Sequence, residues 1–125
     1  MKTVLKTLVL LPAILFVVTG LRWLVTPAPM AAEFGFPLAT GVGLSSQVGD
    51  SSAFFLTLGF CMLMALVTSQ RTWFYPPMVL LYLTALGRTL AWAIHDAALA
   101  VPMIGVEVTV ATLLLVASRF LPEEH

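Results

Sequence analysis

Four long apolar stretches constrain the fold of this chain more than any other feature. They run over residues 4–24, 51–69, 75–94 and 102–120. A helix needs about 20 mostly apolar residues to cross about 30 Å of hydrocarbon, and each stretch meets that length. None alternates apolar and polar residues as the strands of a membrane barrel do. We therefore predict an all-α integral membrane four-helix bundle, up-down-up-down, which forms a single domain over residues 1–125.

The composition excludes several other classes of protein. Only 10% of the residues are charged and the mean hydropathy is +1.03, whereas a soluble domain has about 25% charged residues. The net charge is zero, so the chain lacks the basic field that nucleic-acid binding needs. Its one cysteine, Cys61, excludes an internal disulfide and a cysteine-rich zinc site. No HxxH, HExxH or ExxH motif occurs, and we expect no metal or other cofactor.

Basic residues near the helix ends predict the orientation of the bundle. If the four helices alternate in direction, Lys2, Lys6, Arg71 and Arg119 all lie on one side of the membrane. Lysine and arginine are enriched in the cytoplasmic segments of membrane proteins. We therefore predict that the N- and C-termini are both cytoplasmic.

Residues 25–49 form the longest connection that we expect between the spans. This segment contains three prolines and four glycines, which discourage regular structure, yet it is also rich in apolar residues. Loops of this length are often lids or binding loops. We predict a long outer loop between the first two helices. Two interpretations remain open, a lid over the outer mouth of the bundle and a wrapping segment in the membrane interface without a ligand.

One basic and one acidic residue lie at matching depth within the third and fourth spans. Glu107 comes five residues after Pro102, and Arg88 comes six or seven residues before the end of its span. At 1.5 Å of rise per residue, both lie about 8–10 Å below the outer rim of the membrane. Isolated charges at this depth are costly, so we predict that Arg88 pairs with Glu107. The pair is either a structural ion pair or the floor of a site that binds a head group or moves a proton.

Other polar and aromatic residues fall in the same outer half and complete a predicted polar vestibule. Helical spacing places Arg88, Trp92 and His95 on one face of the third helix. The candidate residues of this ligand-binding or buried polar network are Arg22, Asp50, Arg88, Trp92, His95, Asp96 and Glu107.

Several of these candidates also have a purely structural interpretation. Asp50, which precedes two serines, is suited to cap the second helix. Arg22 either extends to lipid phosphates or pairs with Asp50. His95 and Asp96 form either a proton relay or a hydrated helix end. Trp92 is typical of the aromatic belt at a membrane surface.

Short motifs around the first loop resemble a known group of proteins. They are the first helix end Gly20-Leu21-Arg22-Trp23-Leu24, then Pro27, Glu33-Phe34-Gly35 and Gly49-Asp50. On these motifs the chain resembles an uncharacterised family of bacterial four-helix membrane proteins, similar in architecture to DoxX-like proteins. The resemblance implies a location in the bacterial inner (plasma) membrane. It supplies no substrate and no catalytic residues.

Three classes of function remain open at this point. The favoured one is a non-enzymatic protein that binds a lipid, a quinone or another amphipathic molecule in the outward-facing vestibule. The second is an accessory subunit of a larger membrane complex, or a homo-oligomer. The third is a small enzyme that uses Glu107, Asp50 or His95 as acid or base, with Arg88 stabilising negative charge. In each case the lipid bilayer is the expected partner and nucleic acid is not.

Overall fold

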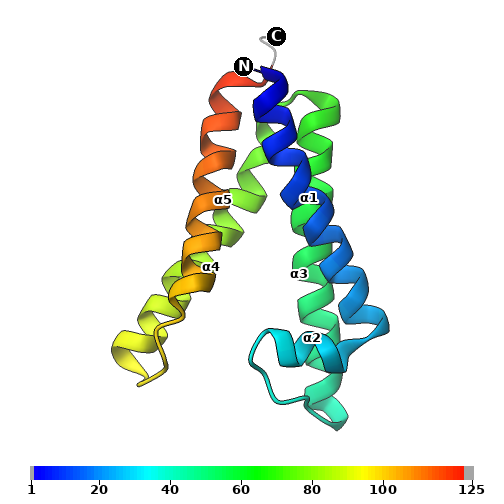
Figure 1. The fold of residues 1–125 in the computed structure, drawn as a ribbon, viewed down its shortest axis with the longest axis vertical. Coiled ribbons are helices and arrows are strands. Elements are labelled where there is room, and N and C mark those ends of the chain that lie inside the picture. The colour runs from blue at the N-terminus through cyan, green and yellow to red at the C-terminus, as the bar shows by residue number, and fades with distance from the viewer. Residues whose placement is uncertain (1, 123–125) are drawn as a thin grey trace.

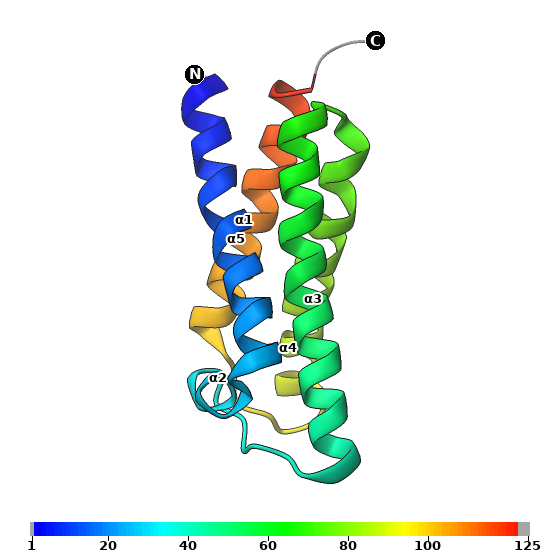
Figure 2. The same ribbon diagram turned by 90° about the vertical axis from the view of Figure 1, so that its right-hand side faces the viewer.

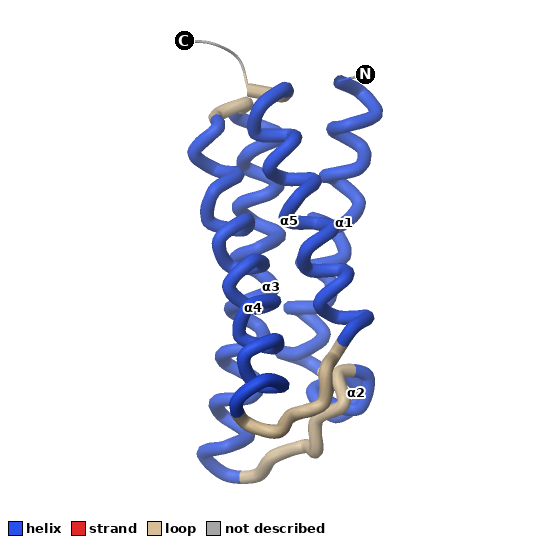
Figure 3. Tube along the Cα trace, turned by 90° about the vertical axis from the view of Figure 1, so that its left-hand side faces the viewer, coloured by secondary structure: helices blue, strands red, loops and turns tan. Residues whose placement is uncertain are grey.

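The computed structural model describes residues 2–122, which fold into α-helices and one short 3-10 helix (Figure 1). The part of the chain that is described contains no strand, as Figure 3 shows. The elements are α1 (Lys2–Val25), α2 (Pro27–Glu33), α3 (Gly41–Thr68), η1 (Arg71–Phe74), α4 (Tyr75–Ile94) and α5 (Val101–Phe120). The predicted all-α class and the four-helix bundle are confirmed.

Four of these helices have the dimensions of membrane spans. Helices α1, α3 and α5, and α4 together with η1, are each long and apolar enough to cross a bilayer. Large apolar side chains are exposed on all four, among them Leu11, Val67, Leu83 and Val116. Soluble monomers rarely expose apolar surface on this scale, whereas hydrocarbon covers it at no cost. The chain is therefore a multi-pass membrane protein by its helix lengths and surface.

The long helices form two antiparallel pairs. Helix α1 packs mainly on α3, and α4 packs mainly on α5. Both ends of the described chain lie at the same end of the bundle, and α2 lies at the opposite end (Figures 1 and 2). The two pairs approach each other near the chain ends and diverge toward α2 (Figure 1). The backbones of the two pairs are consequently closer together at the end near the termini than at the end near α2.

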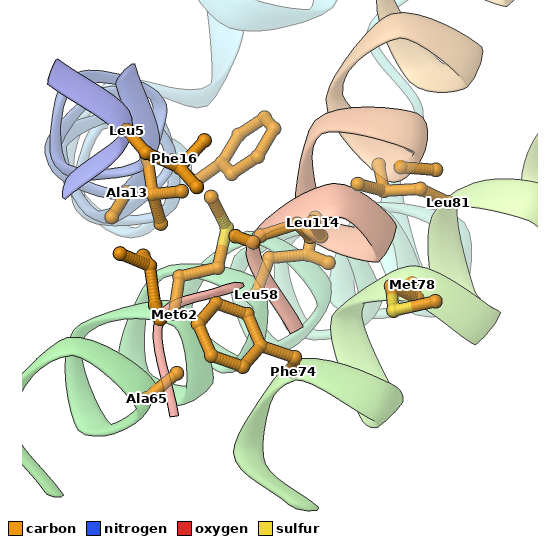
Figure 4. Packing of buried hydrophobic residues seen from close by; sticks show 14 residues of the cluster. Leu5, Ala13, Phe16, Leu58, Met62, Ala65, Phe74, Met78, Leu81 and Leu114 are labelled. Carbon is orange, nitrogen blue, oxygen red and sulfur yellow. The ribbon is translucent and has the colours of Figure 1, made fainter. Parts of the chain in front are cut away.

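A cluster of buried apolar side chains closes the end near the termini. Met62, Phe74 and Leu114, which come from α3, η1 and α5, belong to this cluster (Figure 4). Met62, Phe74 and Leu114 are fully buried. Burial of such side chains contributes about 1.5–3 kcal/mol each relative to water. Within a membrane, close packing of this kind replaces the hydrophobic effect as the attraction between helices.

Two glycines let the backbones of α1 and α3 approach closely. A Cβ atom at Gly59 would lie 2.8 Å from the carbonyl oxygen of Ala13 and 3.0 Å from the backbone nitrogen of Val17. A Cβ atom at Gly20 would lie 2.6 Å from Cγ of Leu56. Small residues at helix crossings are typical of membrane proteins because dispersion contacts grow as backbones approach. These contacts make α1 and α3 the most tightly joined pair.

The connection from α3 to α4 is short, as the sequence predicts. Ser69 ends α3 in the left-handed conformation (φ 56°), and its N–H donates to the carbonyl of Ala65. In the following η1, Arg71 donates through Nε to the carbonyl oxygen of Ser118 at 2.8 Å. This bond ties the turn to α5. Helix α4 then covers residues 75–94, the predicted third span.

The first connection differs from the prediction of a long irregular loop over residues 25–49. Helix α2 occupies part of it, and α3 begins at Gly41 rather than near Ser51. The side chain of Gln47 explains the early start of α3. Its Nε2 donates to the carbonyl of Pro37, and its Oε1 accepts from the N–H of Ala39, both at 3.0 Å. These bonds hold the remaining loop, residues 34–40, against the first turns of α3.

Local sequence accounts for α2. Pro27 occupies its first position, where the missing N–H costs nothing. The next residues include good helix formers, and Gly35 follows the helix with a φ of +76° that only glycine adopts freely. The N–H of Phe36 donates to the carbonyl of Ala31 at 2.8 Å and completes the turn. Met30 and Ala31 are buried against Trp23, which fixes α2 across the end of α1.

Candidate ligand-binding cavity

A cavity of about 400 Å³ lies between the two helix pairs, and it is partly open. Its lining comes from α1, α2, α3, α4, α5 and the residue after α2. The lining residues are Leu15, Phe16, Thr19, Arg22, Met30, Glu33, Phe34, Phe54, Phe55, Leu81, Arg88, Pro102, Met103, Val106 and Glu107. Most of them are apolar, so the predicted polar vestibule is instead an apolar cavity that contains two ion pairs.

Packed aromatic rings form one wall of this cavity. The ring centroid of Phe55 lies 5.4 Å from that of Phe34 and 5.1 Å from that of Phe54, and both pairs are edge to face. Phe55 also contacts Phe16 at 5.9 Å, and Phe34 contacts Trp23 at 5.9 Å. Edge-to-face pairs fix ring orientation beyond what burial alone does. The wall therefore links α1, the end of α2 and α3 into one surface.

The structure contains the Arg88–Glu107 ion pair. Nε of Arg88 donates to Oε1 of Glu107 at 2.9 Å and to Oε2 at 3.2 Å. The side chain of Glu107 is 10% exposed and that of Arg88 is 28% exposed. Glu107 shares its buried face with Ala111, Leu114 and Ser118, as helical spacing predicts. Both side chains line the cavity, and the carboxylate is more deeply buried than the guanidinium.

Arg22 pairs with Glu33, and the expected pairing with Asp50 is wrong. Its terminal nitrogens donate to the two carboxylate oxygens of Glu33, each at 3.2 Å. The pair joins the last turn of α1 to the end of α2. Both side chains are about half exposed, 42% for Arg22 and 54% for Glu33. Folding of residues 27–33 into a helix brings Glu33 within reach of Arg22.

Because it is exposed, the Arg22–Glu33 pair is expected to contribute little to stability. Exposed ion pairs contribute about 0.2–1 kcal/mol in double-mutant cycles. Glu33→Gln should therefore change the free energy of unfolding by less than about 1 kcal/mol. Thermal unfolding in a maltoside detergent, compared with the unsubstituted protein, measures this change. A much larger loss would mean that the pair, and not the burial of Met30 and Ala31, holds α2 in place.

Four of the sequence candidates lie outside the cavity lining. Asp50 is exposed in the third turn of α3, so it does not cap that helix as expected. Trp92 is half exposed on α4. His95 and Asp96 are exposed where α4 ends, and Asp96 has a left-handed φ of 58°. The structure therefore brings together Arg22, Arg88 and Glu107 but not the acid–base set that includes Asp50 and His95.

Glu33 and Phe55 were not among the site residues predicted from the sequence. A signal for Glu33 was present in residues 27–33, where proline precedes helix-forming residues and a glycine follows. That pattern predicts a short helix ending in an acid, close in sequence to Arg22. Helical spacing from Asp50 places Phe54 on the face of the second span that points toward the other helices, and Phe54 does line the cavity. Phe55 carries no comparable signal because neighbouring apolar residues of a membrane span look alike in sequence. Only the packing of α1 on α3 selects the ones that face the cavity.

Comparisons with known proteins add no identity to this geometry. No protein-family model matches the chain, and no curated protein or solved structure matches it. The resemblance to an uncharacterised bacterial family therefore stays a prediction. Within residues 2–122, no group of three or more His, Cys, Asp or Glu side chains is placed to hold a metal ion. The site must be interpreted from its own chemistry.

Proposed function

We propose that this protein binds a lipid, a quinone or another amphipathic small molecule in the cavity between its two helix pairs. A partly open cavity with mainly apolar walls also contains two arginine–glutamate pairs. Ligand sites in proteins are mostly apolar, with a few polar groups that fix orientation. An amphipathic molecule matches both parts, because its tail contacts the walls and its polar group contacts the charges.

The size of the cavity supports a ligand that is only partly enclosed. Ligand pockets span about 300–1,000 Å³, and this cavity of about 400 Å³ lies near the lower limit. It accommodates a polar group with the first part of a tail. Val106 lines the cavity and is nevertheless 58% exposed, so the lining reaches the surface of α5. The remainder of a longer tail would lie in the surrounding bilayer.

We also infer that the protein lies in a bacterial inner membrane with both termini cytoplasmic. Lys2 and Lys6 begin α1, Arg71 lies in the turn before α4, and Arg119 ends α5. These four positions belong to the end of the bundle where both chain ends lie (Figure 1). Their common side supports a cytoplasmic assignment by the positive-inside rule. The cavity and its two ion pairs then belong to the outer half of the membrane.

A matched pair of valines tests the binding site. Val106 and Val108 lie on α5 and are both exposed, but only Val106 lines the cavity. Val106→Trp should obstruct the cavity, and Val108→Trp adds the same bulk outside it. The measurement is native mass spectrometry from detergent micelles with three added probes. These are decylubiquinone, didecanoyl-phosphatidylglycerol and didecanoyl-phosphatidylethanolamine.

At least one probe is expected to bind saturably, with one molecule per chain. Its affinity should fall about tenfold or more in Val106→Trp and stay unchanged in Val108→Trp. A tenfold fall corresponds to the loss of only about 1.4 kcal/mol of binding free energy. If no probe saturates, or if every probe binds the two variants equally, the probes only coat the outer surface of the protein. That result would remove the proposed function.

A further inference from the structure

The four charged side chains that line the cavity indicate which kind of polar group a ligand would carry. Arg22 and Glu33 come from the α1 side, and Arg88 and Glu107 come from α4 and α5. Each arginine is paired with a glutamate of its own half, and among residues 2–122 no ion pair joins the two halves. The four groups sum to zero charge. The empty space between the halves is therefore bordered by groups of both signs.

Arg88 retains hydrogen-bond donors that the protein does not use. Only its Nε contacts Glu107, and its two terminal nitrogens have no hydrogen-bond partner within the described chain. A guanidinium group has five N–H donors in a planar fork, which suits phosphate oxygens. The carboxylate of Glu107 holds the guanidinium of Arg88 through Nε, so the orientation of the guanidinium is set before any ligand binds. The free edge of Arg88 is a ready site for an anionic oxygen group.

Glu33 offers the complementary charge on the opposite side of the cavity lining. Its carboxylate is 54% exposed and accepts one bond at each oxygen from Arg22. An ionised carboxylate has about four acceptor positions, so capacity remains for an ammonium group. Exposure of both partners also makes their own pairing weak. A ligand cation can therefore contact Glu33 without a large loss of protein stability.

We propose that the ligand carries a zwitterionic phosphate–ammonium head group, as phosphatidylethanolamine does, with the phosphate on Arg88 and the ammonium on Glu33. This inference rests on the proposed function. Complementary charges favour the matching partner and exclude one that places like charges together. A zwitterion leaves the neutral cavity neutral, whereas a purely anionic head group brings uncompensated negative charge close to Glu33 and Glu107.

The test uses the phosphatidylethanolamine and phosphatidylglycerol probes described above, which differ in the head-group amine. The unsubstituted protein should bind the ethanolamine probe about tenfold more tightly, a difference of about 1.4 kcal/mol. Glu33→Gln should abolish this preference, because the amide no longer attracts the ammonium. Arg88→Lys should weaken both probes about tenfold while keeping its charge beside Glu107, because the planar fork is lost.

Two outcomes separate the head-group assignment from the proposed function. If phosphatidylglycerol binds as tightly as phosphatidylethanolamine, or if Glu33→Gln leaves the preference intact, the zwitterionic assignment is wrong. The proposed function still stands in that case if Val106→Trp weakens binding and Val108→Trp does not. If Val106→Trp and Val108→Trp bind every probe alike, the proposed function fails and the head-group assignment fails with it.

Discussion

Glu107→Ala is expected to lower the free energy of unfolding by about 2–4 kcal/mol. The substitution leaves the guanidinium of Arg88 without its partner, at a position that is only 28% exposed. Loss of one member of a fully buried pair costs about 3–5 kcal/mol, and the partial exposure of Arg88 reduces that cost. The effect should greatly exceed that of Glu33→Gln, although both changes remove one arginine–glutamate pair.

Two further variants separate the lost charge pair from lost packing. Glu107→Gln keeps the side-chain volume and one acceptor oxygen, so its loss of stability should be smaller. The double variant Arg88→Met with Glu107→Met removes both charges and should recover most of the stability, because apolar replacement of a buried pair is often neutral. Unfolding in sodium dodecyl sulfate, followed by circular dichroism, gives the free energies. A double variant as unstable as Glu107→Ala would contradict this explanation.

Gly59→Ala is expected to cost about 1–3 kcal/mol, despite the better intrinsic helix propensity of alanine. The added methyl group would lie 2.8 Å from the carbonyl oxygen of Ala13. This neighbour is backbone, so relief requires α1 to move away from α3 as a whole. Such a movement loosens the contact on which both the core and the aromatic wall of the cavity depend.

Gly87→Ala is the matched control for this prediction. Gly87 lies within α4, and a Cβ atom at this position would meet no atom of another described helix within 4 Å. Alanine at that position should leave stability unchanged or raise it by up to about 1 kcal/mol, because glycine is unfavourable inside a helix. The same unfolding titration measures both variants. Equal stability of Gly59→Ala and Gly87→Ala would show that α1 and α3 do not cross as closely as described.

The sequence predicted the four helices because membrane burial leaves few alternatives. A run of about 20 apolar residues in hydrocarbon must satisfy its own backbone hydrogen bonds, and a helix does so within the segment. The third span, residues 75–94, agrees with α4 at both ends. The prolines at its start and in the first turn of α5 mark helix beginnings in both sequence and structure.

The first connection could not be predicted in the same way, because its structure depends on contacts between distant residues. Glycines and serines in residues 41–50 suggest a loop, yet they form the first turns of α3. Gln47 stabilises that helical start through the backbone of residues 37 and 39, a contact that no periodicity reveals. Because α3 starts early, it has 28 residues and spans about 42 Å at 1.5 Å per residue, which is longer than the hydrocarbon core of a bilayer.

The candidate site was predictable to the extent that helix depth determines it. Equal depth on adjacent helices predicted that Arg88 and Glu107 meet, because charges within a bilayer must pair. For Arg22 the same argument offered the wrong partner, Asp50, since Glu33 lies in a segment whose helix was not recognised. Asp50 was placed wrongly for a related reason, because the start of α3 lies earlier than the apolar run suggests.

Photo-crosslinking shows whether the space between the helix pairs holds an amphipathic ligand. A phosphatidylethanolamine with a diazirine in its acyl chain is added to the purified protein, irradiated, and its adducts are mapped by peptide mass spectrometry. The expected result is adducts concentrated on cavity residues such as Leu15, Phe54 and Met103. Adducts spread over outward-facing residues such as Leu83 and Val108, with none on the cavity lining, would contradict it.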